Sequence, residues 1–197
     1  MRRNILIGFA VLATVAFGAL LILDYGFGID LVGNSESRQA RETLKAYRAA
    51  AERGEAYGQY GLGGLYYAGI AVDRDSKEAF KWFRKAAEQG LRPAQRNIGV
   101  MYYSGVGVAK DAKEALIWYR KAAEQRDAVA QFEIGKLYGK GEGVARDDKV
   151  AYAWFTIAWE NGEPRAAGAR DKTAGQLTPA QISDAKKRAQ EWLDEHP

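Results

Sequence analysis

The sequence predicts an all-α solenoid, a stack of helix pairs in which each pair buries its apolar face against its neighbours. Two observations predict this fold class. Identical residues recur every 36 positions, and within each period apolar residues return at the three- and four-residue steps of an α-helix. The recurring residues include Tyr66, Tyr102 and Tyr138; Gly63, Gly99 and Gly135; Trp82, Trp118 and Trp154; and Asp75, Asp111 and Asp147.

The first element along the chain is an apolar run, residues 5–23, which contains 19 consecutive residues without a charge. As a helix that rises about 1.5 Å per residue, it would span roughly 28 Å, close to the thickness of a hydrocarbon core. A cleavable signal peptide has a shorter apolar region, about 7–15 residues, that ends in a small-x-small site. The candidate site Ala16-Phe17-Gly18 lies inside the run, so we expect a retained transmembrane helix, with a cleaved signal as the alternative.

The charges around this run predict its orientation. Arg2 and Arg3 precede it, and the next basic residue is Arg38. The positive-inside rule then keeps the N-terminus in the cytoplasm and exports the rest of the chain. Residues 1–35 are therefore expected to form a cytoplasmic stub, the anchor and a glycine-containing linker, and residues 36–197 to form the solenoid.

The period divides the solenoid into a half unit, full units and a cap. Gly54 lies 36 residues before Gly90, so residues 39–53 are expected to form a lone helix that caps the start of the stack. The C-terminal cap comprises residues 163–197. The full units, each predicted to be a helix-turn-helix, cover about residues 55–90, 91–126 and 127–162.

Glycines mark the turns within and between the units. In the second unit the first helix is expected at about residues 94–103, and the glycines of the loop that follows it, Gly105 and Gly107, suit a positive φ. Arg126 and Ala71 stand where other units carry glycine. If the backbone stays left-handed at these two positions, each residue is expected to cost about 1 kcal/mol.

Capping signals mark the starts of later helices. An N-cap residue followed by Glu or Gln three positions on predicts a capping box, in which each side chain bonds the other residue's backbone N–H. In the cap, residues 164–173 are expected to form a degenerate first helix, and residues 178–194 a last helix with Pro179 at its first position. The predicted capping boxes are Asp75 with Glu78, Asp111 with Glu114, and Thr178 with Gln181.

The repeated motif resembles a known family. The second unit reads Ala94-x-x-x-Ile98-Gly99-x-x-Tyr102-x-x-Gly105-x-Gly107-Val108-x-x-Asp111-x-x-x-Ala115-x-x-Trp118-x-x-x-Ala122-Ala123. This pattern resembles the Sel-one-like repeat, a relative of the tetratricopeptide repeat, and the resemblance covers about residues 39–162. It implies a right-handed α/α superhelix and a role in protein–protein interaction, often in bacterial envelopes, and it implies no shared enzyme activity.

The resemblance also indicates a binding face, because the first helix of each unit lines the concave surface in tetratricopeptide-like stacks. Tyr and Arg are residue types that often contribute most to interface energy. An alternative is that some of the aromatic residues pack between helices, Tyr67 and Tyr103 first among them. The recurring tryptophans are expected in the core. The partner-binding residues predicted from the resemblance are Tyr57, Tyr60, Tyr67, Arg96, Val100, Tyr103, Phe132 and Lys136.

The sequence offers no catalytic constellation. It contains no cysteine and one histidine, His196, so a histidine-based triad or metal cluster is not expected. The glycine-rich loops lie between helices rather than after a strand, which disfavours phosphate binding. The net charge of +4 comes from 29 basic and 25 acidic residues mixed along the chain, without the basic stripe of nucleic-acid-binding proteins. We expect no enzyme activity, cofactor, metal or small-molecule substrate.

These observations favour a membrane-anchored adaptor that binds a protein partner through the concave face of its solenoid. The expected location is the bacterial inner membrane, with a single pass, a cytoplasmic N-terminus and the solenoid in the periplasm. Two narrower hypotheses stay open. One is an immunity protein that inhibits an antibacterial phospholipase-type effector of a secretion system. The other is a regulatory subunit of an envelope signalling, cell-wall or exopolysaccharide system.

Overall fold

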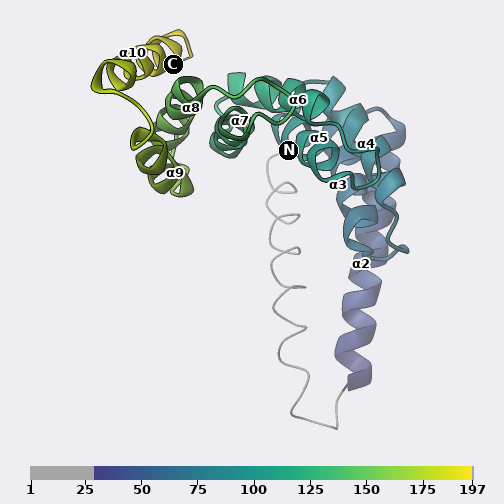
Figure 1. Cartoon of the computed structure of the whole chain (residues 1–197). Helices are drawn as coiled ribbons and strands as arrows, with labels where there is room; N and C mark the ends of the chain where they lie inside the picture. Colours follow the sequence, from purple (N-terminus) through teal and green to yellow (C-terminus); the bar gives the residue numbers. More distant parts are fainter. Residues whose placement is uncertain (1–28, 197) are drawn as a thin grey trace. The chain divides into compact units, whose positions relative to one another are not determined.

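The computed structural model describes residues 29–196, and over this range the chain consists of helices and turns (Figure 1). Contacts within the chain divide it between residues 45 and 46, a point that lies within the first described helix. The helices are α2 (Ile29–Glu52), α3 (Ala56–Ala68), α4 (Ser76–Glu88), α5 (Arg92–Ser104), α6 (Ala112–Glu124), α7 (Ala128–Lys140), α8 (Asp148–Glu160), α9 (Arg165–Ala174) and α10 (Pro179–Glu195).

The helices α3 to α8 stack as the predicted pairs. α3 packs on α4, α5 on α6 and α7 on α8, and contacts of α4 with α5 and of α6 with α7 join each pair to the next. α9 and α10 both pack on α8, so this one helix carries both elements of the C-terminal cap. Buried residues form a series of clusters along the pairs. This arrangement confirms the all-α solenoid.

The N-terminal predictions have different outcomes. Residues 5–23, the predicted anchor, lie outside the described residues, and the anchor stays a prediction. Within the described part of the chain, no helix is both long enough and apolar enough to cross a membrane. The linker prediction is wrong for residues 29–35, because α2 begins at Ile29 rather than near Gln39. No proline interrupts this stretch, and a helical glycine costs only about 1 kcal/mol, so the helix extends toward the N-terminus.

A close contact between a first-helix glycine and a second-helix aromatic ring recurs in every repeat. A Cβ atom added to Gly99 would lie 2.6 Å from Cδ1 of Tyr119, well inside van der Waals contact. Tyr119 is only 1% exposed, so its ring cannot move aside. Glycine is therefore required here for the approach of two helices rather than for backbone freedom. The equivalent pairs are Gly63 with Phe83, Gly99 with Tyr119, and Gly135 with Phe155.

The prediction that all three recurring tryptophans lie in the core is only partly correct. Trp118 is buried at 6% exposure, whereas Trp82 and Trp154 are half-buried. The ring that faces the glycine belongs to the residue after each tryptophan, and the tryptophans of the first and third repeats turn partly outward. Nζ of Lys85 lies 4.2 Å from the centroid of the Trp82 ring, and this cation–π contact covers part of the exposed indole.

The residue that covers the recurring tryptophan is different in the third repeat. Nζ of Lys121 lies 4.1 Å from the Trp118 ring, but the corresponding position in the third repeat is Ile157. Trp154 contacts Trp192 of α10 instead, with ring centroids 5.5 Å apart. An indole from the cap thus replaces the lysine of the earlier repeats, as the altered third unit requires.

The turns confirm the predicted left-handed positions. Gly105 and Gly107 both have φ of 74°, and Arg126 and Ala71 adopt φ of 59° and 61°. Gly107 is restricted by space as well, because a Cβ there would lie 2.0 Å from the Ser76 carbonyl oxygen of the preceding repeat. Ala71 is exposed, so its cost arises from backbone strain alone.

Two of the three predicted capping boxes are incomplete. The Asp111 carboxylate accepts hydrogen bonds from the backbone N–H groups of Lys113 and Glu114, as an N-cap should. The reciprocal bond does not form, because the Asp111 N–H donates to the Tyr102 carbonyl at the end of the preceding helix (2.8 Å). Asp75 repeats this pattern. The complete box is at α10, where Thr178 and Gln181 bond one another's backbone N–H groups.

We predict that Gly99→Ala destabilises the chain by about 2 kcal/mol or more, because the added methyl overlaps the buried Tyr119 ring. The matched control is Gly64→Ala on α3, where an added Cβ meets nothing within 4 Å. That change should be neutral or stabilise by up to about 1 kcal/mol through helix propensity. Urea unfolding measures both, and equal effects of the two substitutions would contradict the close-contact explanation.

We predict that Ala71→Gly stabilises the chain by about 0.5–1 kcal/mol, since glycine adopts the left-handed conformation without steric strain. Ala109 is also exposed in a loop but has no positive φ, so Ala109→Gly is the control and should not stabilise. Thermal and urea unfolding of the two variants test this. Stabilisation by Ala109→Gly of the same size would argue against strain at Ala71.

Candidate functional site

The first helix of each repeat has one side in the core and one side toward solvent. The core side carries Leu62, Ile98 and Ile134, each at most 1% exposed. On the other side lie some of the predicted partner-binding residues, of which Tyr57 is 73% exposed, and Tyr67 and Val100 are each 41% exposed. We call this solvent side of α3, α5 and α7 the first-helix face; its residues are Tyr57, Tyr67, Val100, Tyr103 and Lys136.

Lysines surround Tyr103 on this face. Nζ of Lys110 lies 5.6 Å from the ring centroid, and Nζ of Lys136 and of Lys140 each lie 5.9 Å from it. The Lys140 ammonium also donates a hydrogen bond to the Tyr103 hydroxyl (3.2 Å), and this bond raises the pKa of Lys140 above its usual value. The half-buried ring thus holds three ammonium groups close to one patch of surface.

Tyr67 has a related environment one repeat earlier. The Arg74 guanidinium carbon lies 5.7 Å from the Tyr67 ring centroid, and Arg74 occupies the position equivalent to Lys110. The Tyr67 ring also packs against Phe83, with centroids 6.4 Å apart, yet remains substantially exposed. Tyr67 and Tyr103 therefore contact neighbouring helices with one edge and solvent with the other.

Phe132, one of the predicted partner-binding residues, does not have the accessibility that this prediction requires. It is only 8% exposed, its ring packs 5.6 Å from that of Phe155, and the Arg165 guanidinium carbon lies 4.8 Å from its centroid. α9 supplies this arginine and thereby closes the third repeat. Tyr60, at the equivalent position of the first repeat, also turns inward, 5.4 Å from Phe83.

Arg96 also has a structural partner. Its guanidinium lies 3.0 Å from the carboxylate of Asp127, which is 5% exposed and caps α7 through the Ala130 N–H. An unpaired buried carboxylate would be costly, so Arg96 stabilises the joint between the second and third repeats. Arg96 therefore spans a joint of the fold and is not a free cation of the face.

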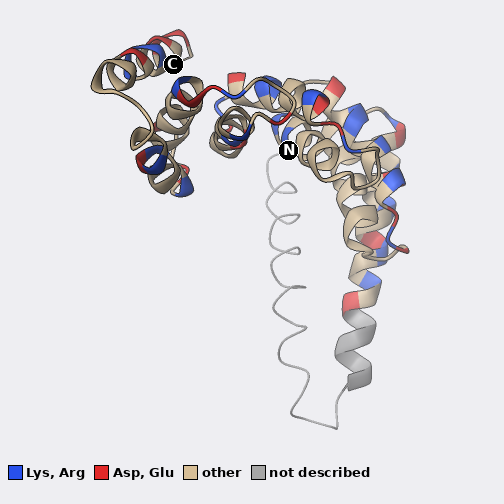
Figure 2. Cartoon of the chain, viewed as in Figure 1, with Lys and Arg blue, Asp and Glu red and all other residues tan. Residues whose placement is uncertain are grey.

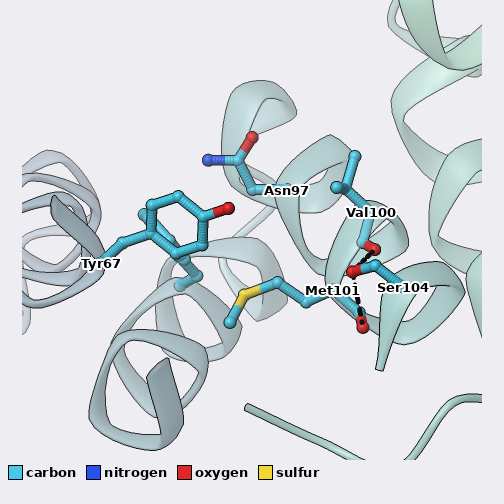
Figure 3. A pocket seen from close by; sticks show the side chains of 6 residues that line it. Tyr67, Asn97, Val100, Met101 and Ser104 are labelled. Carbon is cyan, nitrogen blue, oxygen red and sulfur yellow. Dashed lines mark hydrogen bonds between the residues drawn. The ribbon is translucent and has the colours of Figure 1, made fainter. Parts of the chain in front are cut away.

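A small cavity, which we call the notch, opens at the joint between the first and second repeats (Figure 3). Its volume is about 120 Å³. Phe83 and Met101 form its buried part, whereas Tyr67 and Val100 are exposed at its mouth. The lining residues are Tyr67, Phe83, Asn97, Val100, Met101 and Ser104.

Three notch residues on α5 were not predicted from the sequence, namely Asn97, Met101 and Ser104. A comparison of equivalent positions could have indicated them, because Glu133 and Lys140 stand one period after Asn97 and Ser104. Two positions on one side of a helix thus change from short uncharged to long charged side chains. Such a change indicates joints with different surfaces.

A buried polar ladder was missed as well. The Gln125 amide donates to the Gln95 side-chain oxygen (2.8 Å) and to the Gly90 carbonyl (2.9 Å). Gln95, 6% exposed, donates in turn to the carbonyl of Ala87 in the preceding repeat. These amides join repeats and are not available to a partner. The equivalent pairs are Gln59 with Gln89 and Gln131 with Asn161.

The distribution of charge does not single out another site. Basic and acidic residues are intermixed over the described helices (Figure 2). Among residues 29–196, no group of three His, Cys, Asp or Glu side chains is placed to hold a metal ion. The surface feature that combines exposure, shape and charge is the first-helix face with its notch.

Comparison with known families identifies the repeat. A model of the Sel1 repeat matches residues 56–91, 92–127 and 128–163, which is more than half of the chain. The chain belongs to the Sel1 repeat family. The matched boundaries agree with the predicted units to within one residue. Sel1 repeat solenoids generally mediate protein–protein interaction and are typically not enzymes.

Solved structures support the assignment. A Sel1 repeat protein from Oxalobacter formigenes is 34% identical, with a TM-score of 0.66, over 77% of this chain and 64% of that one. A protective antigen present in uropathogenic Escherichia coli strains is also 34% identical, with a TM-score of 0.61, over 78% of this chain and 41% of that one. This chain thus spans less than two thirds of either relative.

A third relative is shorter. Helicobacter pylori cysteine rich protein B is 25% identical with a TM-score of 0.53, over 67% of this chain and 95% of that one. The chain described here has no cysteine, so contacts between helices, rather than disulfides, hold its repeats together. The comparison with curated proteins found no match.

We predict that Phe132→Ala destabilises the chain by about 3 kcal/mol, because it removes a buried ring packed between Phe155 and Arg165. Tyr57→Ala should change stability by less than about 0.5 kcal/mol, since Tyr57 is 73% exposed. Urea unfolding of the two variants checks the assignment of Phe132 to the core. If both variants were as stable as the parent chain, Phe132 would belong to the surface.

Proposed function

We propose that this Sel1 repeat chain is an adaptor that binds a protein partner through the first-helix face. The observation that carries the proposal is the presence on this face of exposed apolar and aromatic side chains, Tyr57, Tyr67 and Val100. Aromatic residues contribute disproportionately to interface energy, and exposed apolar surface rimmed by polar groups is typical of interaction sites.

The comparison of repeats within the chain supports the same face. Core positions keep their residue type from repeat to repeat, because each must fill the same space. Positions on the face change freely: Gly64, Val100 and Lys136 occupy one equivalent position. The fold does not require a particular residue there, so the residue type at this position can be selected for binding to a partner.

We further propose that the adaptor is tethered to the bacterial inner membrane with its solenoid in the periplasm. Residues 5–23 are uncharged and long enough to span a bilayer, and Arg2 and Arg3 precede them. No observation favours the immunity or regulatory hypothesis over a general adaptor.

Photocrosslinking in cells tests the binding face. A photoreactive amino acid is placed at Tyr57 or at Val100 in the full-length chain, and at Ile117 as the control. Ile117 is 46% exposed but lies on α6, a second helix. We expect protein adducts from Tyr57 and Val100 and none from Ile117. Adducts from Ile117 alone, or from no position, would overturn the proposal.

A further inference from the structure

We propose that the notch receives one apolar side chain of an acidic segment of the partner protein. The carboxylates of that segment would lie beside the cations that cover Tyr67 and Tyr103. This inference rests on the proposed function and specifies the chemistry of the partner at one point of the first-helix face.

The volume of the notch limits what can bind in it. Pockets for metabolites and drug-sized ligands have volumes of about 300–1,000 Å³. The notch, at about 120 Å³, holds instead a single side chain. Its buried part consists of the Phe83 ring and the Met101 thioether, which are 4% and 2% exposed, so the inserted side chain would be apolar.

The second joint carries different side chains at the positions that line the notch. One period after Asn97, Val100 and Ser104 come Glu133, Lys136 and Lys140. Lys136 pairs with Glu133, and Lys140 donates to the Tyr103 hydroxyl. Long charged side chains that bond neighbouring groups thus stand at the second joint where the first joint has short uncharged side chains.

Polar groups at the mouth of the notch are free to bind a peptide backbone. Figure 3 shows the Asn97 amide and the Tyr67 ring beside the pocket that both residues line. Within the described part of the chain, neither the Asn97 amide nor the Tyr67 hydroxyl forms a hydrogen bond, whereas the Ser104 hydroxyl donates to the Val100 carbonyl (2.7 Å). An inserted segment would satisfy the first two groups through its own N–H and C=O groups.

Charge complementarity identifies the rest of the segment. Arg74 over Tyr67 and Lys110 over Tyr103 form no ion pair with any described residue. Val100, at the mouth, and Tyr103, which lies among the lysines, are one helical turn apart on α5. An extended segment rises about 3.3 Å per residue, so its acidic residue would stand roughly two to four positions from the apolar one.

Selection from a phage-displayed library of short random peptides on the full-length chain tests this. We expect the enriched peptides to share one large apolar residue with Asp or Glu roughly two to four positions away. Binding of the most enriched peptide is then measured by fluorescence anisotropy. Its affinity should fall roughly tenfold or more in a triple variant, and should weaken as salt is raised.

The triple variant is Asn97→Glu, Val100→Lys and Ser104→Lys, which introduces at the first joint the residue types that the second joint carries. Because the fold already accommodates this set one repeat later, the variant should keep its circular dichroism spectrum and unfolding midpoint. Lys110→Glu should also weaken the peptide. Lys186→Glu, an equal charge change on an exposed residue of α10, is the matched control and should not.

Several results would overturn the inference. They are the absence of enriched peptides, enriched peptides without an acidic residue, or equal binding to the triple variant. Self-association of the full-length chain that the triple variant abolishes would also overturn it, because the occupant would then be a second copy. In each case, photocrosslinks from Tyr57 and Val100 to another protein would leave the adaptor proposal standing without the notch.

Discussion

The contact between a first-helix glycine and a second-helix aromatic ring sets the geometry on which the rest of the solenoid depends. Gly99 lets α5 approach α6 until the Tyr119 ring covers the glycine backbone. At that separation the Tyr102 carbonyl meets the Asp111 N–H, and the Asp111 side chain can cap α6. The recurring Gly99, Tyr102 and Asp111 therefore all stabilise the same helix–turn–helix geometry. The Tyr119 ring fills the space between the two helices.

The sequence predicts the fold well because local rules and the period agree. The unit boundaries, the left-handed Arg126 and the Thr178 capping box all follow from residue types at fixed spacing. The periodicity could not decide which of two adjacent aromatics, Trp118 or Tyr119, would face the glycine, since both lie near the same helix side. The Asp111–Glu114 box failed because a non-local carbonyl had already taken the N–H it needed.

The candidate site was predictable only as a surface. Register correctly placed Tyr57, Tyr67 and Val100 toward solvent. Register could not show that Phe132 would be covered, because Arg165 comes from the cap, outside the three repeats. The notch arises from a difference between joints rather than from a shared position, so a search for recurring residues does not find it. Residues that recur every 36 positions are those that the fold requires, and positions where the residue type differs between repeats mark a change in the surface.

The contact between Trp154 and Trp192 restricts how a chain of this kind can grow. Each earlier tryptophan carries a lysine from its own helix, so a duplicated unit placed between existing repeats brings its own cover. A unit added after the third repeat would separate Trp154 from α10 and leave an indole without its cover. Duplication of a unit inside the array would therefore keep each indole covered, whereas addition of a unit at the C-terminal end would not.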